Sequence, residues 1–415
     1  GTFTAGESGS SVCFDVSANA NISGGDFSSG SLFITTDGEG TNLTVTGGTF
    51  KDPLSFADCG NGCLPARDEN GNYTVSTGNV AAIQQSDGSY VGYPNVAAAI
   101  AAAENGVTVT LIDKGTLTEA CTIASGKAIT LDLNGQDIDL TTDAAQFTIP
   151  ANATLEVVGK GTLRNKTVNY SRGNRIFEVR GASADDGTKA ILKVGADVTL
   201  ECTCGIVVFG VADTPTAAYG VEVEVAGTIN NKMYAITTNG QITTTEGNVP
   251  VIKVTGKING PNAVGIYAAG YAKWDLAADI VADDALSIKS GDFTIAGGSY
   301  TSSAVYAVPP SANPGGNETT GAAISITTSD GYAQKTSVNI TGGTFISENG
   351  YALYEGIAKK ADGTPAANAS AVTIAISGNA LFQGGDAVNT DIAITEAANK
   401  KVLSGGLFTK PVDLA

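Results

Sequence analysis

The sequence predicts an all-β solenoid, a fold in which short strands stack coil upon coil. Runs that alternate apolar and polar residues recur along most of the chain, with a spacing of about 30 residues in its middle part. Charged residues make up only 15% of the 415 residues, which favours stacked strands over helix bundles, whose exposed faces usually need Glu, Lys and Arg. One Ala-rich segment, Asn95–Glu104, has the pattern of a helix. A lone helix followed by an unbroken series of short strands indicates a solenoid with a capped end.

Residues 1–79 are expected to be the tail of a preceding unit. After a Gly-Gly pair, the pattern Phe-x-x-Pro occurs at Phe50–Pro53 and again at Phe408–Pro411. We therefore interpret residues 1–79 as the C-terminal coils of one β-helical unit, 80–89 as a linker and 90–415 as a second unit. The chain is then one slice through a tandem array, and its first tail should not continue the stack of the second unit.

The second unit opens with the predicted helix. Asn95 is a good residue to cap its first turn, and Gly106 stands where a left-handed residue commonly follows a helix. Directly afterwards the period changes, because Val107–Leu111 and Ile129–Leu133 alternate apolar and polar residues as strands do. We expect the helix to lie at the N-terminal end of the stack.

The run Ser89–Asn165 carries a resemblance to a known family. It contains AAIAAA, VTVTLI, ITLDLNGQDI and ATLEVVGKGTLRN, of which the LDLNG element is the most specific. This run resembles the beginning of a right-handed parallel β-helix of the pectin-lyase-like type found in secreted surface proteins, adhesins among them, of gut Firmicutes. The resemblance implies that residues 90–415 form a right-handed parallel β-helix with a short N-terminal capping helix. It also implies that the protein is secreted or held at the cell surface.

A coil repeat can be followed between the two tails. Val223–Ile229 recurs as Ile252–Ile258, and a spacing of about 30 residues fits a coil of three short strands joined by turns. Over residues 88–408 this spacing predicts about ten to twelve coils. Gly227 and Gly256 occupy equivalent corners, where they supply either a positive φ or room for a close approach of the backbone.

Later coils show a different corner, in which glycine is followed by an aromatic residue. The runs SGDF, AGGSY and TGGTF end at Phe293, Tyr300 and Phe345. We expect these three rings to stack inside the coils or to cover their corners.

Composition argues against several functions. The 23 Lys and Arg against 41 Asp and Glu give a net charge of −18, which repels a phosphate backbone and argues against nucleic-acid binding. No run of about 18 apolar residues is present, so no membrane span is expected. Cys59 and Cys63 lie close enough in sequence to bridge across a turn, and Cys202 and Cys204 should project from one face of a strand. Without any His this pattern is a weak metal signal, so we expect buried thiols, no cofactor, and no indication of Ca²⁺.

The chain lacks the catalytic sets that pectin-lyase-like enzymes use. Hydrolysis of the polygalacturonase type needs clustered Asp with an adjacent His, and lyases need acidic Ca²⁺ ligands beside an Arg. The chain has no His, and its only Asp-Asp pairs are Asp185-Asp186 and Asp283-Asp284. We interpret both pairs as turn residues that face solvent and predict a protein that is not an enzyme.

A basic island stands out in this acidic chain. Four of its five Arg lie within seventeen positions, and the island comprises Arg164, Lys166, Tyr170, Arg172, Arg175 and Arg180. One interpretation is a binding site for an anionic glycan or an acidic surface, because Arg pairs bidentately with carboxylates. The alternative is that these cations pair with the Asp and Glu of the protein itself.

We therefore expect a non-catalytic extracellular surface protein that acts as a β-helical stalk or adhesin and binds glycan along one face. Its expected partners are glycans or a host or cell-surface molecule, and neighbouring copies or tandem units of itself. Two alternatives stay open at this point: a polysaccharide lyase or glycoside hydrolase on the same scaffold, and a structural unit of a head-to-tail filament or sheath.

Overall fold

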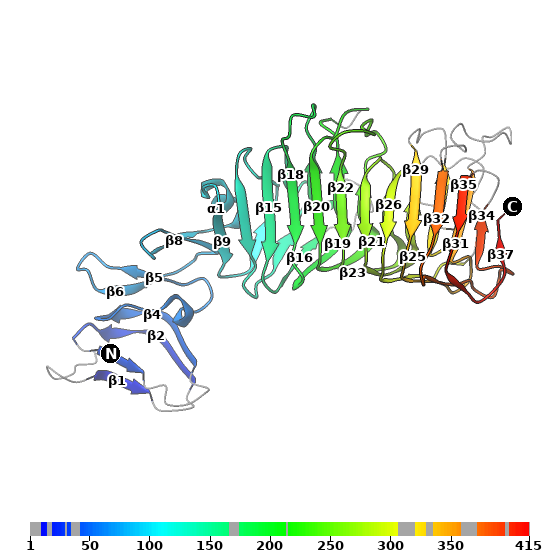
Figure 1. Cartoon of the computed structure of the whole chain (residues 1–415). Helices are drawn as coiled ribbons and strands as arrows, with labels where there is room; N and C mark the ends of the chain where they lie inside the picture. The colour runs from blue at the N-terminus through cyan, green and yellow to red at the C-terminus, as the bar shows by residue number, and fades with distance from the viewer. Residues whose placement is uncertain are drawn as a thin grey trace.

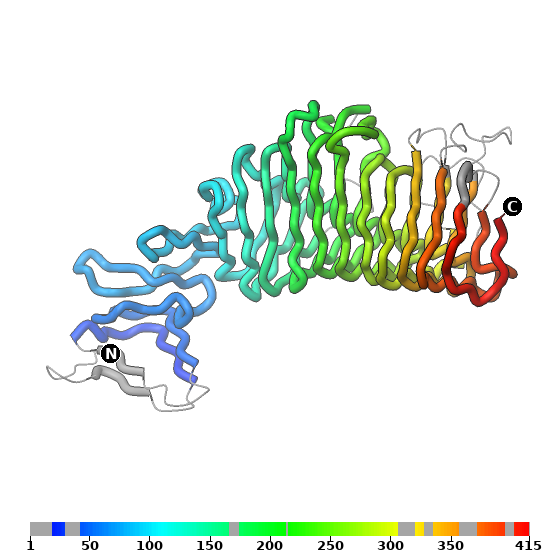
Figure 2. The backbone as a smooth tube through the Cα atoms, viewed as in Figure 1, coloured from blue at the N-terminus to red at the C-terminus, as the bar shows by residue number. Residues whose placement is uncertain are grey.

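The protein is nearly all β, with strands over 56% and helices over 3% of the chain. The computed structural model describes residues 10–14, 19–29, 31–34, 42–165, 174–212, 215–305, 320–328, 335–357, 372–394 and 398–414. A long stack of strands fills most of the molecule, and a smaller group of strands at the N-terminus lies beyond one of its ends (Figure 1). The chain winds through the stack in a series of similar coils (Figure 2).

The first long sheet has thirteen strands in the described part of the chain, and eleven of them pair in parallel with their neighbours. These eleven follow one another in chain order: β9 (Val107–Leu111), β12 (Ala128–Asp132), β15 (Ala153–Val158), β18 (Ala190–Val194), β20 (Val221–Val225), β22 (Val251–Val254), β24 (Lys273–Leu276), β26 (Gly291–Ile295), β29 (Thr336–Ile340), β32 (Val372–Ile376) and β35 (Ala398–Leu403). Eleven stacked strands lie within the ten to twelve coils expected from the sequence.

The second long sheet has eighteen strands and contains two parallel ladders that run side by side. Its strands are β10 (Gly115–Leu117), β11 (Ala120–Thr122), β13 (Ile138–Leu140), β14 (Gln146–Ile149), β16 (Gly161–Asn165), β17 (Arg175–Arg180), β19 (Val198–Phe209), β21 (Thr228–Thr238), β23 (Lys257–Ala268), β25 (Asp279–Ile288), β27 (Ser299–Ser302), β28 (Ile324–Thr328), β30 (Thr344–Ser347), β31 (Leu353–Ile357), β33 (Leu381–Gln383), β34 (Ile392–Ile394), β36 (Leu407–Phe408) and β37 (Val412–Asp413). Strands β19, β21, β23 and β25 pass through both ladders. Three long ladders of parallel strands are consistent with a solenoid whose coil has three sides.

The coil repeat seen in the sequence is confirmed by the strand register. Val223 pairs with Ile252 and Ile229 pairs with Ile258, so equivalent residues of the two copies lie directly above one another. The offset between paired residues is 29 from Val223 to Ile252, 22 from there to Trp274, and 19 from Trp274 to Phe293. The strands therefore keep their register while the connections change length, and the spacing expected from the sequence holds only in the middle of the stack.

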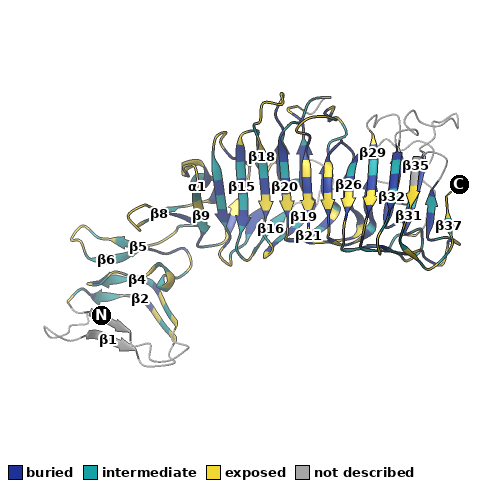
Figure 3. Ribbon diagram, viewed as in Figure 1, coloured by how far each residue is buried: buried dark blue, intermediate teal, exposed yellow. Residues whose placement is uncertain are grey.

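One apolar core runs through the stack, because alternate side chains of each strand point inward. Buried and exposed positions alternate along the strands of the first sheet (Figure 3). Aromatic rings form a column in the later coils, with centroid distances of 4.9 Å from Tyr300 to Phe345, 4.9 Å from Phe345 to Phe382 and 5.3 Å from Phe382 to Phe408. Phe293 stacks on Trp274 at 5.6 Å in the first sheet. The expectation that these rings stack inside the coils is confirmed for Phe293, Tyr300 and Phe345, which are at most 2% exposed.

The N-terminal end of the stack holds a hairpin and the helix α1 (Val96–Ala102). The Asn95 side chain accepts a hydrogen bond of 2.8 Å from the backbone N–H of Ala98, as expected of an N-cap. Gly106 has a φ of +81°, which a residue without a Cβ adopts readily. Val96, Ala99 and Ile100 on α1 are buried and belong to the core of the stack.

Residues 80–89, expected to be a linker, contain a strand of the first sheet. β7 (Ala81–Gln84) pairs antiparallel with β9 on one side and with β8 (Tyr90–Tyr93) on the other. Ala81, Ala82 and Ile83 are at most 5% exposed, so this segment adds to the stack. The sequence interpretation took all of residues 80–89 for a connection, whereas they contain β7 and the turn of the β7–β8 hairpin.

The N-terminal group of strands forms sheets of its own. In the described residues, β1 (Ser10–Phe14) pairs in parallel with β3 (Ser31–Ile34), and β2 (Asn19–Phe27) pairs in parallel with β4 (Asn42–Phe50). β4 continues antiparallel to β6 (Tyr73–Ser76), which pairs with β5 (Leu64–Arg67), and a 3-10 turn covers Phe56–Asp58. None of these strands joins the long sheets in the part that the structure describes. That residues 1–79 are the tail of a preceding unit stays a prediction. The group touches the stack, since Phe56 stacks on Tyr90 at 4.5 Å.

Candidate functional site

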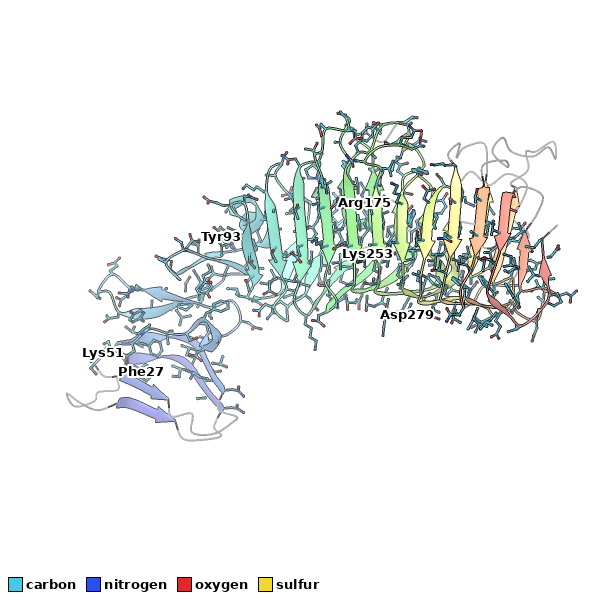
Figure 4. All side chains as sticks on the ribbon, in the orientation of Figure 1. Phe27, Lys51, Tyr93, Arg175, Lys253 and Asp279 are labelled. Atoms are coloured by element: carbon cyan, nitrogen blue, oxygen red, sulfur yellow. The ribbon has the colours of Figure 1, made fainter. Side chains whose placement is uncertain are left out.

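Three of the six residues of the basic island can be placed in the structure. Arg164 lies on β16, and Arg175 and Arg180 lie at the two ends of β17, in the second sheet. Lys166, Tyr170 and Arg172 lie outside the described residues. Arg175 is found on the middle coils of the stack (Figure 4).

Arg164 is held by three carboxylates. Its Nε donates to Glu201 at 2.5 Å, and its Nη1 lies 3.3 Å from Asp137 and 3.4 Å from Asp139. Lys114 contacts the other oxygen of Asp139 at 2.8 Å. The hydrogen bond to Glu201 is the main cause that raises the pKa of Arg164 above its usual value. Asp137 raises this pKa in addition. The side chain keeps 26% of its surface exposed.

Arg175 and Arg180 converge on a single buried carboxylate. Both guanidinium groups pair with Glu178, whose side chain is 4% exposed, and Gln146 donates to it at 3.2 Å. Each guanidinium also stacks over the Phe209 ring, with 4.9 Å between its central carbon and the ring centroid. Such contacts fix both cations on the sheet surface.

The described part of the basic island is therefore charge-compensated. Counting Arg164, Arg175, Arg180 and Lys114 against Asp137, Asp139, Glu178 and Glu201 gives four positive and four negative charges. This is the arrangement that the alternative interpretation of the island expects. Ligand binding by the complete island stays a prediction.

A second polar surface was not predicted from the sequence. On the outer face of the first sheet, Glu156, Lys193, Glu224, Lys253 and Asp275 lie opposite one another in successive strands. We call this column the charge ladder. Its residues alternate in sign from coil to coil, and all but the half-buried Glu156 are exposed. The ladder could have been found from the sequence, because the recognised repeat already places Glu224 opposite Lys253.

The charge ladder borders a shallow depression of about 300 Å³. Glu156, Lys193, Glu224 and Lys253 line it together with the backbone around Gly195 and Thr255. Lys193 and Glu224 are 3.9 Å apart, too far for a strong hydrogen bond, so their donors and acceptors remain accessible to a polar ligand.

The two Asp-Asp pairs have different environments. Asp185 and Asp186 are exposed, as expected, and Asp186 accepts a hydrogen bond of 2.9 Å from the backbone N–H of Thr188. The same expectation is wrong for Asp283-Asp284, because both residues lie inside strand β25.

Asp284 is completely buried and anchors a distant part of the chain. Its carboxylate accepts hydrogen bonds from the backbone N–H groups of Thr320 at 3.0 Å and Gly321 at 2.9 Å. Burial raises the pKa of this carboxyl group to about 7, although its hydrogen bonds and the nearby Lys289 lower it. Local sequence patterns missed this role because the partners of Asp284 lie 36 and 37 positions further along the chain.

None of the five cysteines whose side chains are described forms a disulfide. Cys59 and Cys63 form no disulfide in the structure. Cys202 belongs to the main core, whereas Cys204 packs with Tyr234 in a separate cluster, and the pairing of β19 with β21 shifts its register between the two cysteines. They do not share one face as expected. Burial raises the pKa of the Cys121 thiol to about 12, which keeps it protonated and unreactive at neutral pH.

Two features that would define a function are absent from the described residues. No group of three or more His, Cys, Asp or Glu side chains is arranged to hold a metal ion. No helix in this part of the chain is long and apolar enough to cross a membrane.

Comparison with protein families, curated proteins and solved structures found no match to this chain.

Proposed function

We propose that this chain is a non-catalytic extracellular surface protein in which a right-handed parallel β-helix serves as a stiff stalk or adhesive spacer. The observation that carries the proposal is the set of three ladders of parallel strands around one continuous apolar core. Every coil in such a stack is held by the coil below and the coil above. A stack of this kind sets a fixed distance between whatever is attached to its two ends.

We propose further that α1 and the β7–β8 hairpin close the N-terminal end of this β-helix. The buried face of α1 contributes Val96, Ala99 and Ile100 to the core. A closed end protects the first coil from pairing with foreign strands, which is a recurrent need of stacked sheets.

Ligand binding is proposed for the polar surfaces along the stack. The basic island and the charge ladder lie on different sheets, and each displays cationic groups beside carboxylates. A glycan that bears carboxylates and hydroxyls finds donors and acceptors on either surface. Successive coils repeat these groups about every 4.8 Å, so an extended polymer can contact several of them.

The enzyme alternative has one observation in its favour. A carboxyl group with a pKa of about 7 is a candidate general acid or base, and Asp284 is such a group. However, Asp284 has no exposed surface and is engaged by two backbone N–H groups. A substrate could reach it only after local unfolding, which supports the non-catalytic proposal.

The test is to incubate the chain with pectin, alginate and host-type glycans, with and without Ca²⁺, and to measure both binding and cleavage. We expect retention on at least one acidic glycan without release of unsaturated or reducing ends. Reproducible turnover that is lost in Asp284→Asn, Asp283→Asn or Asp185→Asn would overturn the proposal.

Two variants distinguish which of the two proposed surfaces binds glycan. Arg164→Gln weakens the basic island, and Lys253→Gln weakens the charge ladder on the other sheet. Loss of glycan retention in one variant alone assigns the binding surface, provided that both unfold at the temperature of the unmodified chain. Retention unaffected by either substitution removes both surfaces from the proposal.

A further inference from the structure

The outer face of the first sheet is an open surface along the charge ladder. Each ladder residue occupies an outward position of its strand, directly opposite its neighbours in the strands on either side. Exposed residues mark this face along the middle strands of the sheet (Figure 3). Because neighbouring strands lie about 4.8 Å apart, the ladder presents charges of alternating sign at that interval.

The ladder residues form few ion pairs within the chain. Lys193 and Glu224 lie 3.9 Å apart. No other ion pair joins two members of the ladder, all of which the structure describes. Lys253 has no carboxylate partner in the described part of the chain. These charged groups are therefore available to a partner from outside the chain.

The positions beside the ladder allow another surface to approach closely. The residues that directly follow β15, β18, β20 and β22 are all small: Gly159, Gly195, Ala226 and Thr255. Two positions before the ladder residues of the same strands lie Thr154, Ile191, Glu222 and Val251. Val251 is 41% exposed, so the face also contains apolar surface. The depression beside the ladder leaves room for the long side chains of a partner.

We propose that the charge ladder is an interface through which two copies of this chain pair side by side. A column whose sign alternates is complementary to itself when a two-fold axis parallel to the strands passes between two of its members. That rotation sets the two outer faces against each other, keeps the strand direction and reverses the direction of stacking. The proposal goes beyond the stalk function and does not depend on glycan binding.

The depression indicates where the two-fold axis passes. Its lining includes Glu156 and Lys193 on one side of the boundary between β18 and β20, and Glu224 and Lys253 on the other. With the axis at that boundary, Lys193 faces Glu224 of the second copy, and Glu156 faces Lys253 of the second copy. Each contact occurs twice because of the symmetry, which gives four ion pairs.

The sign pattern restricts the register of this contact. Among the flanking positions of the four strands, Glu222 is the one charged residue, and it faces Ile191 of the second copy. Moving the axis by half a strand spacing, onto β20, would set Glu224 against Glu224 and Lys193 against Lys253. Like charges that face each other across an interface are destabilising, so the axis must pass between strands.

Charge complementarity favours a second copy as the occupant. The ladder needs a partner whose charges alternate at the strand spacing, and the ladder of another copy has this pattern. A partner of uniform charge would place a like charge against every second member. The contact does not involve the basic island, which lies on the second sheet.

The first test measures self-association of the unmodified chain by sedimentation velocity. We expect a reversible dimer at about 100 µM protein in about 50 mM salt. The dissociation constant should rise by about tenfold or more when the salt is raised to about 500 mM, because salt screens the charges across the interface. A chain that stays monomeric at about 100 µM, or association that salt does not weaken, would overturn the proposal.

A charge-swap experiment tests the pairing itself. Lys253→Glu and Glu156→Lys each create two like-charge contacts in the proposed dimer, so each variant alone should dimerise about tenfold more weakly or worse. A mixture of the two variants restores opposite charges at all four contacts and should associate as tightly as the unmodified chain. Lys257→Glu is the control, because Lys257 is an exposed cation on β23 of the second sheet, and it should leave the dissociation constant unchanged.

Recovery in the mixture also shows that both variants are folded, because a misfolded chain could not restore the contact. The proposal is refuted if the mixture dimerises no better than the single variants, or if the control weakens association as much as Lys253→Glu does. These experiments contain no glycan, so their outcome is independent of the glycan-retention assay.

Discussion

Asp284 shows how one side chain can couple the fold to pH. Its carboxyl group is buried in β25 and holds the returning chain at Thr320 and Gly321. In the unfolded chain an Asp ionises near pH 4, whereas burial raises the folded pKa to about 7. The folded state therefore keeps a proton that the unfolded state has released between these two pH values.

The sign of the effect follows from this difference. The stabilisation by proton binding is complete below about pH 4 and is lost as the pH rises to about 7. We expect the contribution of Asp284 to the free energy of unfolding to fall by about 1.4 kcal/mol per pH unit across that window. Asp284→Asn should remove this slope and should be the more stable protein at pH 8. Urea unfolding of both proteins at pH 4.5, 6 and 8 measures how the free energy of unfolding changes with pH.

Asp186→Asn is the control for this experiment. Asp186 is exposed, and its hydrogen bonds to Thr188 lower its pKa. The variant Asp186→Asn should therefore leave the pH dependence of the free energy of unfolding between pH 4.5 and 8 unchanged. The same slope in the unmodified chain and in Asp284→Asn would contradict the account.

Gly256 illustrates a position where size, not φ, requires glycine. A Cβ at Gly256 would lie 2.0 Å from the carbonyl oxygen of Gly227, and one at Gly227 would lie 2.4 Å from that of Val198. Neither residue has a positive φ, so of the two explanations open at the sequence level the close approach is the correct one.

Gly256→Ala should destabilise the stack by about 1 to 3 kcal/mol, because the coil below must shift to admit the methyl group. Gly297→Ala is a matched control, since its Cβ would meet only the Ala277 Cβ at 4.0 Å and its φ is not positive. Thermal unfolding compares the two variants. Equal unfolding temperatures for Gly256→Ala and Gly297→Ala would contradict the prediction, because they would mean that neighbouring coils move apart without cost.

At the scale of elements, the aromatic column ties successive coils together. Phe345 is fully buried, with a ring 4.9 Å away on each side. Phe408 is half-buried and has a described ring partner on one side, Phe382. Phe345→Ala should therefore cost about 3 to 5 kcal/mol, as expected for a fully buried Phe. Phe408→Ala should cost clearly less. Chemical denaturation of both variants measures the difference, and a larger loss at Phe408 would be inconsistent with this column.

Sequence reasoning predicted the elements well where the signal was local. Alternation of apolar residues gave the strands around Val223 and Ile252, and Asn95 gave the start of the helix. It failed where the structure depends on distant partners. Residues 81–84 become a strand because β9 offers them an edge, and Asp283-Asp284 enters a strand because a later loop supplies N–H groups. The ion pairs of the basic island likewise join strands up to 37 positions apart, which no local pattern specifies.

At the scale of the whole molecule, the stack should give an extended particle in solution. Eleven coils separated by about 4.8 Å make an axis of about 48 Å, to which the N-terminal group adds. A compact globular chain of this length would have a radius of gyration of about 22 Å. Because the N-terminal group lies beyond one end of this axis, small-angle scattering, extrapolated to zero concentration, should give a larger value. A measured radius equal to that of the compact chain would contradict an extended arrangement.

The charge ladder has a consequence for the order in which the coils assemble. The inward residues of β18, β20 and β22 are almost interchangeable, so the core alone barely distinguishes one neighbouring strand from the next. Skipping one strand during folding would set Glu156 against Glu224, or Lys193 against Lys253, and like charges directly opposite each other repel. The alternation of sign on the surface therefore acts as a sequence-encoded check on assembly: between β15 and β24 it penalises a misalignment by one coil that the uniform interior would tolerate.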